Sequence, residues 1–128
     1  MPHFTIYLPL AINISNIEEA LVSELKISRE ETKVFVLIIK NGKMDNEKIA
    51  KLLNWSIEDT DKVVKSLINL GMVIKINESD YESLHPRFAI TNRYRRLCQE
   101  YNLPFKKNLK IDNIALLLER PYDHARTK

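Results

Sequence analysis

The apolar positions between residues 45 and 71 fall into two runs with three- and four-residue spacing. The members of the two runs are Ile49, Leu52, Leu53, Val63, Val64, Leu67, Ile68 and Leu70. Because this spacing places apolar side chains on one face of a helix, it predicts two amphipathic helices. Trp55 lies in the turn between the runs, and Gly71 ends the second run. Two short helices joined by a tight turn are typical of a helix-turn-helix.

A pair of extended runs follows directly after the second predicted helix. Residues 72–76 are mostly apolar, residues 77–80 are all polar, and residues 81–84 form a returning run. Clusters of Asn, Ser and Asp between extended segments are typical of turns. The pattern therefore predicts two strands around a polar tip, which is a wing behind the helix-turn-helix.

Two further helices are predicted ahead of the helix-turn-helix. The first ends at Leu25 and takes its cap from Ser15 or Asn16. Ser28, with Glu31 three residues later, forms a capping box that opens the second helix. The second half of this helix is apolar on nearly all sides, so we expect it to be the central buried helix.

The segment after the wing has two interpretations. In the first, a helix runs from about Pro86 to Asn102, since proline is well accommodated at the first position of a helix. In the second, the strand continues to Ile90 and the helix begins at a Thr91 or Asn92 cap. We favour the first interpretation.

The ends of the chain are predicted to be simpler. Residues 3–14 read as a short strand or an extended arm. Asp112 can cap a last short helix over residues 113–120, and we expect the tail from Pro121 onward to be frayed. The elements together predict an α+β fold, mainly helical: a winged helix-turn-helix with additional N- and C-terminal elements. We expect one domain over residues 1–128, with the winged helix at 15–86 and C-terminal helices at 87–128.

The net charge of +3 is distributed unevenly along the chain. Residues 1–80 hold ten Lys and Arg against twelve Asp and Glu, whereas residues 81–128 hold ten against five. The basic charge therefore follows the helix-turn-helix rather than lying on it. This matters because neutralised phosphates supply much of the affinity of proteins for DNA.

The segment from Leu25 to Pro86 resembles the TrmB-like winged-helix proteins of archaea. The matching stretches are SREETKVFVLIIKNGKMDNEKIAKLLNWS, VVKSLINLGMVIKI and the YESLHP close of the wing. The chain also resembles the MarR-like group, whose pattern has a Thr-capped helix after the wing, as Ile90-Thr91-Asn92 would provide. Larger TrmB-like proteins carry a sugar-binding domain, for which this chain is too short. We therefore expect a short form for which no sugar ligand is implied.

The resemblance implies a transcription regulator that binds double-stranded DNA. The second helix of the motif would enter the major groove, and the wing would touch the backbone or the minor groove. The residues placed to contact DNA are Ser56, Lys62, Lys65, Ser66, Asn69, Lys75 and Arg87. The chain departs from the family pattern at Glu58, Asp59 and Asp61, since three carboxylates would repel phosphates.

These acids motivate a second hypothesis. The winged helix would be a protein-interaction module in a transcription or replication assembly, with the acidic helix docking a basic partner. Glu58 and Asp59 also suit the positive end of the helix dipole, which is a purely structural explanation for them.

A denser basic cluster lies after the wing, at Arg87, Arg93, Arg95 and Arg96. Helical spacing puts Arg93 and Arg96 on a shared face. The cluster could hold DNA backbone, bind an acidic partner, or pair with the surplus acids of residues 1–80.

An apolar stripe in the last predicted helix has two interpretations. It consists of Ile111, Ile114, Leu117 and Leu118. It could form the interface of a homodimer, which would present two reading heads to two half-sites. Alternatively, it folds back on its own chain and covers the first helix. We favour the homodimer.

The remaining features argue against an enzyme. A single cysteine, Cys98, excludes an intrachain disulfide and is expected to be a buried apolar residue. His3, His85 and His124 lie far apart, without ligand-type neighbours at metal-binding spacing. With only two glycines there is no glycine-rich phosphate loop. We expect no cofactor, no membrane span, no signal peptide and a cytoplasmic location.

Overall fold

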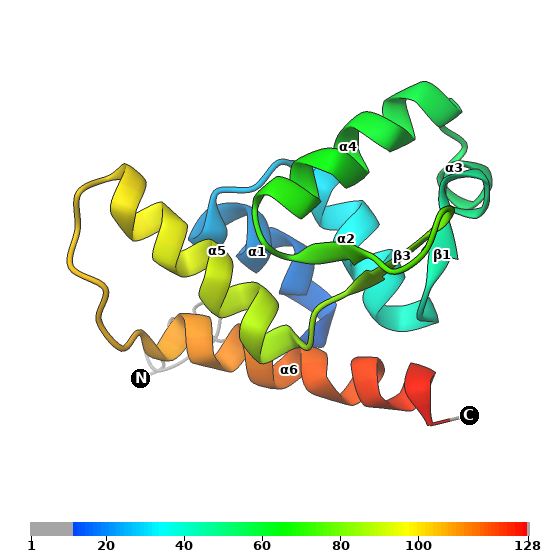
Figure 1. Cartoon of the computed structure of the whole chain (residues 1–128). Helices are drawn as coiled ribbons and strands as arrows, with labels where there is room; N and C mark the ends of the chain where they lie inside the picture. Colours follow the sequence, from blue (N-terminus) through cyan, green and yellow to red (C-terminus); the bar gives the residue numbers. More distant parts are fainter. Residues whose placement is uncertain (1–11, 128) are drawn as a thin grey trace, which may run out of the picture.

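The computed structural model describes residues 12–127, which form a helical body with a small sheet (Figure 1). A 3-10 turn, η2 (Ile14–Asn16), leads into α1 (Ile17–Leu25) and α2 (Arg29–Asn41). The short strand β1 (Met44–Asp45) precedes the helix-turn-helix, which consists of α3 (Asn46–Leu53) and α4 (Ile57–Asn69). The wing is β2 (Val73–Lys75) and β3 (Asp80–Ser83), and the chain ends with α5 (Pro86–Glu100) and α6 (Leu109–Arg126). The mainly helical winged-helix fold predicted from the sequence is confirmed. Most of the predicted arm at residues 3–14 lies outside the described residues.

The centre of the core is α2, as predicted. Ser28 Oγ accepts a hydrogen bond from the Glu31 N–H at 3.0 Å, and Glu31 Oε1 accepts one from the Ser28 N–H at 2.8 Å. The helix thus begins at the expected capping box. Phe35 and Ile38 are fully buried between the surrounding helices. Each such side chain contributes about 1.5–3 kcal/mol by leaving water, so α2 anchors the elements that pack on it.

The sheet has the order β1-β3-β2 and is antiparallel throughout. The two wing strands pair with Val73 opposite Ser83 and Lys75 opposite Tyr81. Gly71 makes the turn from α4 into β2 with a φ of 81°. This left-handed conformation favours glycine. The short strand β1 was not predicted, because two residues are too few for an alternating pattern to be visible.

The helix after the wing follows the first of the two interpretations. It starts at Pro86, with His85 Nδ1 accepting a hydrogen bond from the Arg87 N–H at 3.1 Å. The interpretation in which the strand continued to Ile90 is wrong. Proline has no N–H for a strand ladder, and its fixed φ already suits the first turn of a helix.

The last helix is longer than predicted, and the expected fraying from Pro121 onward is wrong. Helix α6 begins after Asn108, whose Oδ1 accepts from the Lys110 N–H at 3.0 Å, and it continues through Pro121 to Arg126. Arg126 fastens its end: the guanidinium donates to the Ile39 carbonyl at 2.8 Å and forms an ion pair with Glu82 of the wing. Distant contacts therefore order a segment that local rules would leave frayed.

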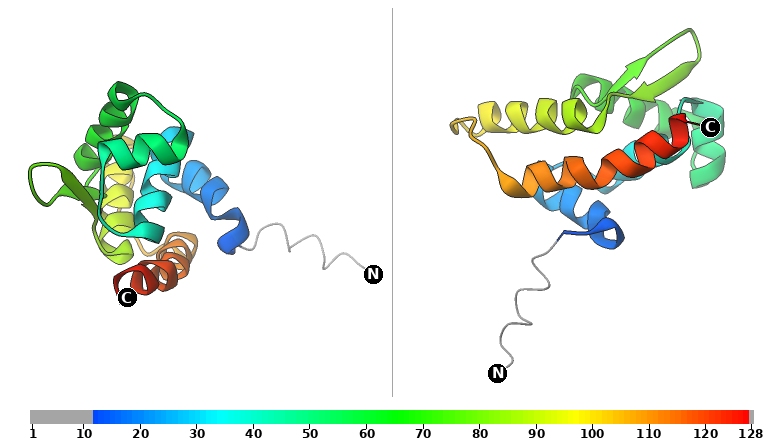
Figure 2. Two further views of the ribbon diagram at one scale, coloured as in Figure 1. Left: turned by 90° about the vertical axis from the view of Figure 1, so that its right-hand side faces the viewer. Right: turned by 90° about the horizontal axis from the view of Figure 1, so that it is seen from below.

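The apolar stripe of α6 packs against its own chain. Ile111, Ile114 and Leu118 are buried, and Leu117 is partly buried against the same core. Helix α6 lies alongside α5 and also packs on α1 and α2 (Figure 2). The assignment of these residues to a dimer interface is therefore corrected: their apolar surface is already covered, as in the alternative interpretation.

Candidate nucleic-acid interface

Helix α4 presents a polar outward face because its inward face is fixed in the core. Ser56 caps it, accepting a hydrogen bond from the Asp59 N–H at 3.0 Å. Thr60, Val64 and Leu67 are buried toward α2 and α3. Helix α4 runs along the upper edge of the molecule (Figure 1), and the side chains opposite the buried ones are exposed to solvent. Burial on one side gives the outward face a fixed orientation.

Four of the seven predicted DNA contacts are exposed at α4. Lys62, Lys65 and Asn69 lie on its outward face, and Ser56 lies at its N-terminal cap. Ser66 lies closer to the body and is half-buried, and its hydroxyl donates to Glu31 Oε2 at the start of α2. We therefore assign Ser66 to positioning α4, since its hydroxyl is already engaged.

The other two predicted contacts lie on different elements. Lys75 is exposed on the wing, with Nζ 6.0 Å from the centroid of the Tyr81 ring. Arg87 turns toward α6, where Nε lies 3.0 Å from a carboxylate oxygen of Glu119. Because α6 and α4 lie on opposite sides of the molecule (Figure 1), the structure does not bring Arg87 to the face of α4.

Lys65 on α4 is paired with an acid of the same helix. Its Nζ lies 2.8 Å from Asp61 Oδ2, and Asn46 of α3 donates to Asp61 Oδ1 at 2.9 Å. The hydrogen bond from Lys65, followed by that from Asn46, lowers the pKa of Asp61, while Asp61 raises the pKa of Lys65. Both groups are therefore charged at neutral pH, and Asp61 offsets the charge of Lys65.

This pair has a defined pH dependence. Because the folded-state pKa of Asp61 is lowered, the pair stabilises the fold above the ordinary Asp pKa, and the stabilisation is lost as pH falls through the lowered value. The Lys65 side chain is 68% exposed, so the contribution to stability is small. The main consequence of the pair is for the charge that α4 presents.

The unpaired acids of this region lie at the start of α4 and at the wing tip. Glu58 and Asp59 are exposed in the first turn, where their negative charges interact favourably with the positive end of the helix dipole. At the wing tip, Asn77 Oδ1 accepts from the N–H groups of Ser79 and Asp80, both at 2.9 Å, beside the exposed Glu78. These acids leave the C-terminal half of α4 as its more positive part.

A match to a family model shows which protein family has this arrangement of helices and strands. A model described as the sugar-specific transcriptional regulator TrmB matches residues 21–96. The match covers more than half of the chain, including α2, the helix-turn-helix and the wing. The chain belongs to the TrmB family. Neither a curated protein nor a solved structure matched it. The predicted resemblance is confirmed, and the TrmB family is one of transcriptional regulators rather than of enzymes.

The arginine cluster after the wing is divided among different surfaces of this TrmB-family chain. Arg93, predicted to share a face with Arg96, is only 5% exposed and donates from Nε to the Leu25 carbonyl at 2.9 Å. Its Nη1 lies 3.1 Å from Glu100. Arg95 and Arg96 remain exposed. Of the three roles considered for the cluster, contact with DNA backbone does not fit Arg93, because its guanidinium donates to the Leu25 carbonyl at the end of α1.

Other candidate chemistry in residues 12–127 is limited. Within this range, no group of three or more His, Cys, Asp or Glu side chains is placed to bind a metal ion. Cys98 is buried, as expected for an apolar role. In the same range, no helix is both long and apolar enough to cross a membrane. The polar surface around α4 is thus the feature to explain functionally.

Sequence reasoning missed the neighbours that control this surface. Asn46 follows the cap of α3 yet binds Asp61, and Glu31 completes a capping box yet binds Ser66. No local signal reports the first contact. The second had a partial signal, since the capping box identified Glu31 as oriented at the start of α2, but its Oε2 partner comes from a remote segment.

Proposed function

We propose that this chain is a transcription regulator that binds double-stranded DNA, with α4 entering the major groove. The observation that carries the proposal is the rigidly held outward face of α4, with Lys62, Lys65 and Asn69 exposed on it. Membership of a family of transcriptional regulators supports it. Such a regulator acts where the chromosome lies, which in an archaeal cell is the cytoplasm.

In this proposal Lys62 and Lys65 contribute unequally. Lys62 is exposed, and among the described residues no acid pairs with it. Lys65 must first exchange its contact with Asp61 for one with a phosphate. Asn69 can donate and accept hydrogen bonds at base edges or phosphates. We therefore expect Lys62 to contribute more to binding than Lys65.

Substitution of Lys62 tests this function. Lys62→Gln is expected to weaken binding to a labelled random-sequence duplex by about threefold to tenfold, through loss of one phosphate contact. Fluorescence anisotropy at low salt measures the change. Lys33→Gln, which removes another exposed positive charge, from α2, is the matched control and should change affinity less than twofold. Equal effects of the two substitutions would count against a site on α4.

We further propose that the regulator is a homodimer, now through an exposed surface beside the buried residues of the stripe. A groove along α6 is lined there by Ile14, Leu116 and Pro121, with the partly buried Leu117 of the stripe at its edge. Ile14 and Leu116 are exposed there, and a second copy would remove them from water. Sedimentation velocity at tens of micromolar should give a dimer, and Leu116→Glu should shift it toward monomer. A monomeric wild type would contradict the pairing.

A second candidate function is supported by Glu58 and Asp59. Both carboxylates are exposed at the start of α4, where a DNA-binding helix would approach phosphates. A basic protein partner would fit these acids in place of DNA. Binding measurements on variants that lack the two carboxylates distinguish the two functions, because their loss would strengthen binding to DNA and weaken binding to a basic protein.

A further inference from the structure

The outer face of α5 is a second polar surface next to α4. Asn92, Arg95, Arg96 and Gln99 recur at helical spacing on this face. Their opposite face, with Ala89, Ile90 and Leu97 among others, is buried. The one acid of α5 is Glu100, which is engaged by the buried Arg93 at 3.1 Å. The outer face of α5 therefore carries two positive charges, and the carboxylate nearest to it, that of Glu100 at the end of the helix, is 53% exposed but paired with Arg93.

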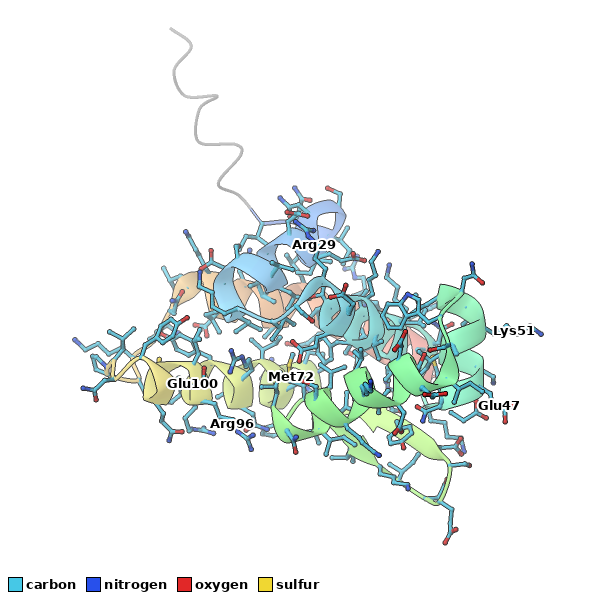
Figure 3. All side chains as sticks on the ribbon, turned by 90° about the horizontal axis from the view of Figure 1, so that it is seen from above. Arg29, Glu47, Lys51, Met72, Arg96 and Glu100 are labelled. Carbon is cyan, nitrogen blue, oxygen red and sulfur yellow. The ribbon has the colours of Figure 1, made fainter. Side chains whose placement is uncertain are left out.

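This face begins where α4 ends. Asn92 Nδ2 donates to the Gly71 carbonyl at 2.9 Å, in the turn that follows α4. A Cβ placed on Gly71 would lie 3.5 Å from Arg96 Nη2, so the guanidinium lies directly against this turn. Figure 3 shows Arg96 projecting away from the core on the side where α4 ends. The two polar faces are thus adjacent.

The exposed polar groups of the two helices follow one another as a strip from α4 to α5. On α4, Lys62, Lys65 and Asn69 share the outward face and span about 10 Å along the helix axis. Beyond the Gly71 turn the strip continues through Arg96 to Arg95. A DNA backbone carries closely spaced phosphates, so an extended strip of cations matches it better than one lysine does.

Arg95 is held in place without losing its charge. Its guanidinium lies over the Phe105 ring, 5.1 Å from the centroid, and Nη1 is 3.4 Å from Asn92 Oδ1. Phe105 is itself packed against Tyr94, with ring centroids 5.6 Å apart. Because an aromatic ring orients a cation without neutralising it, less side-chain freedom is lost when a phosphate binds.

The wing, in contrast, carries more acidic than basic side chains. Its tip carries the acids Glu78 and Asp80 and is closed by Asn77. Lys75 is the single cation of the segment 72–84. Phosphates would therefore be repelled at the tip and attracted on the opposite side of the Gly71 turn.

We propose that the outer face of α5 is a phosphate-binding surface, on which the DNA backbone leaves α4 and lies across Arg96 and Arg95. The proposal rests on the proposed function, since it extends the same DNA site. In this proposal the DNA backbone is contacted by α5 and not by the acidic tip of the wing. Lys62, Lys65 and Asn69 then contact the groove edge, and the two arginines fix the orientation of the duplex.

Replacing both arginines tests the proposal. Arg95→Gln/Arg96→Gln is expected to lower the affinity for a labelled random duplex about tenfold, and to reduce the slope of log affinity against log salt by about two units. The matched control is Lys33→Gln/Lys40→Gln, which removes two exposed charges from α2. The control should keep the slope of the wild type and change the affinity less than twofold.

The outcomes separate this proposal from the proposed function. If the wild type binds the duplex and the arginine variant keeps both its slope and its affinity, the α5 surface is overturned while the DNA-binding function stands. Equal losses in the arginine variant and the α2 control would also overturn it, because the effect would then reflect net charge. If the wild type binds no duplex at low salt, both fail together. Unchanged near-UV circular dichroism and thermal midpoint confirm that each variant is folded.

Discussion

Arg93→Ala is expected to lower the free energy of unfolding by about 3 kcal/mol, a large effect for a single charged side chain. The guanidinium donates to the carbonyls of Leu25 and Lys26, where the end of α1 would otherwise lack partners. Lys26 has a φ of 54°, so the chain turns sharply at this point. Loss of the side chain removes these hydrogen bonds and leaves a space between α1 and α5. Urea unfolding followed by circular dichroism measures the change.

Arg96→Ala is the matched control for this prediction. Its side chain lies on the exposed side of the same helix, and surface substitutions there change stability by about 0.5 kcal/mol or less. A loss below about 1 kcal/mol in Arg93→Ala would mean that water replaces the guanidinium at the two carbonyls, and that Arg93 does not hold α1 on α5.

The second large effect is expected in the opposite direction, as a gain of DNA affinity. Replacing the three acids of α4, in Glu58→Gln/Asp59→Asn/Asp61→Asn, should tighten binding to a random duplex about a hundredfold. Each carboxylate near a phosphate costs on the order of 1 kcal/mol, which is roughly fivefold. Asp61→Asn also frees Lys65, while the amide oxygen can still accept from Asn46. Titration by fluorescence anisotropy at fixed salt measures the gain.

The control for the acid substitutions keeps the change in net charge constant. The control variant removes three exposed acids from α1, α2 and α6, in Glu18→Gln/Glu30→Gln/Asp123→Asn. It should tighten binding about threefold or less, through the electrostatic field of the whole protein. The α4 variant should also lose roughly 1 kcal/mol of stability, because it gives up favourable charges at a helix start. If it binds DNA no better than the control, the acids do not face DNA, and the protein-partner function is favoured.

Much of the fold followed from local signals. The capping box of Ser28 and Glu31 marked the start of α2 correctly, and the apolar spacing over residues 45–71 located α3 and α4. These predictions succeed because caps and periodicity depend on residues within one or two turns of each other. The turn at Gly71 was predictable because glycine readily adopts a positive φ, which is a property of that single residue.

The errors arose where distant contacts decide the outcome. Pro121 is a local reason to end a helix, but Arg126 holds the next turn through carbonyls of α2 and the Glu82 carboxylate. The α6 stripe was correctly identified as apolar, yet spacing shows which face is buried and not what covers it. Arg93 and Arg96 are the same residue type three positions apart, and contacts of Arg93 with the carbonyls of Leu25 and Lys26, far away in sequence, distinguish their roles.

The candidate site was predictable to a similar extent. The exposure of Lys62, Lys65 and Asn69 on one face of α4 followed from its periodicity, and their contact with DNA stays a prediction. The direction of the Arg87 side chain did not follow from the sequence, because its partner Glu119 lies 32 residues later, in α6. The adjacency of Arg96 and the Gly71 turn depends on how α5 packs against α4, which no local pattern encodes.

The most direct test of DNA binding is the salt dependence of wild-type affinity for a random duplex. The cations assigned to the interface are Lys62, Lys65, Arg95 and Arg96. Four phosphate contacts predict a slope of log affinity against log salt of about −3.6. A slope near this value would establish a duplex-binding surface of the proposed extent. Absence of binding at low salt, or a slope shallower than about −1, would contradict it and direct the search to protein partners of the acidic start of α4.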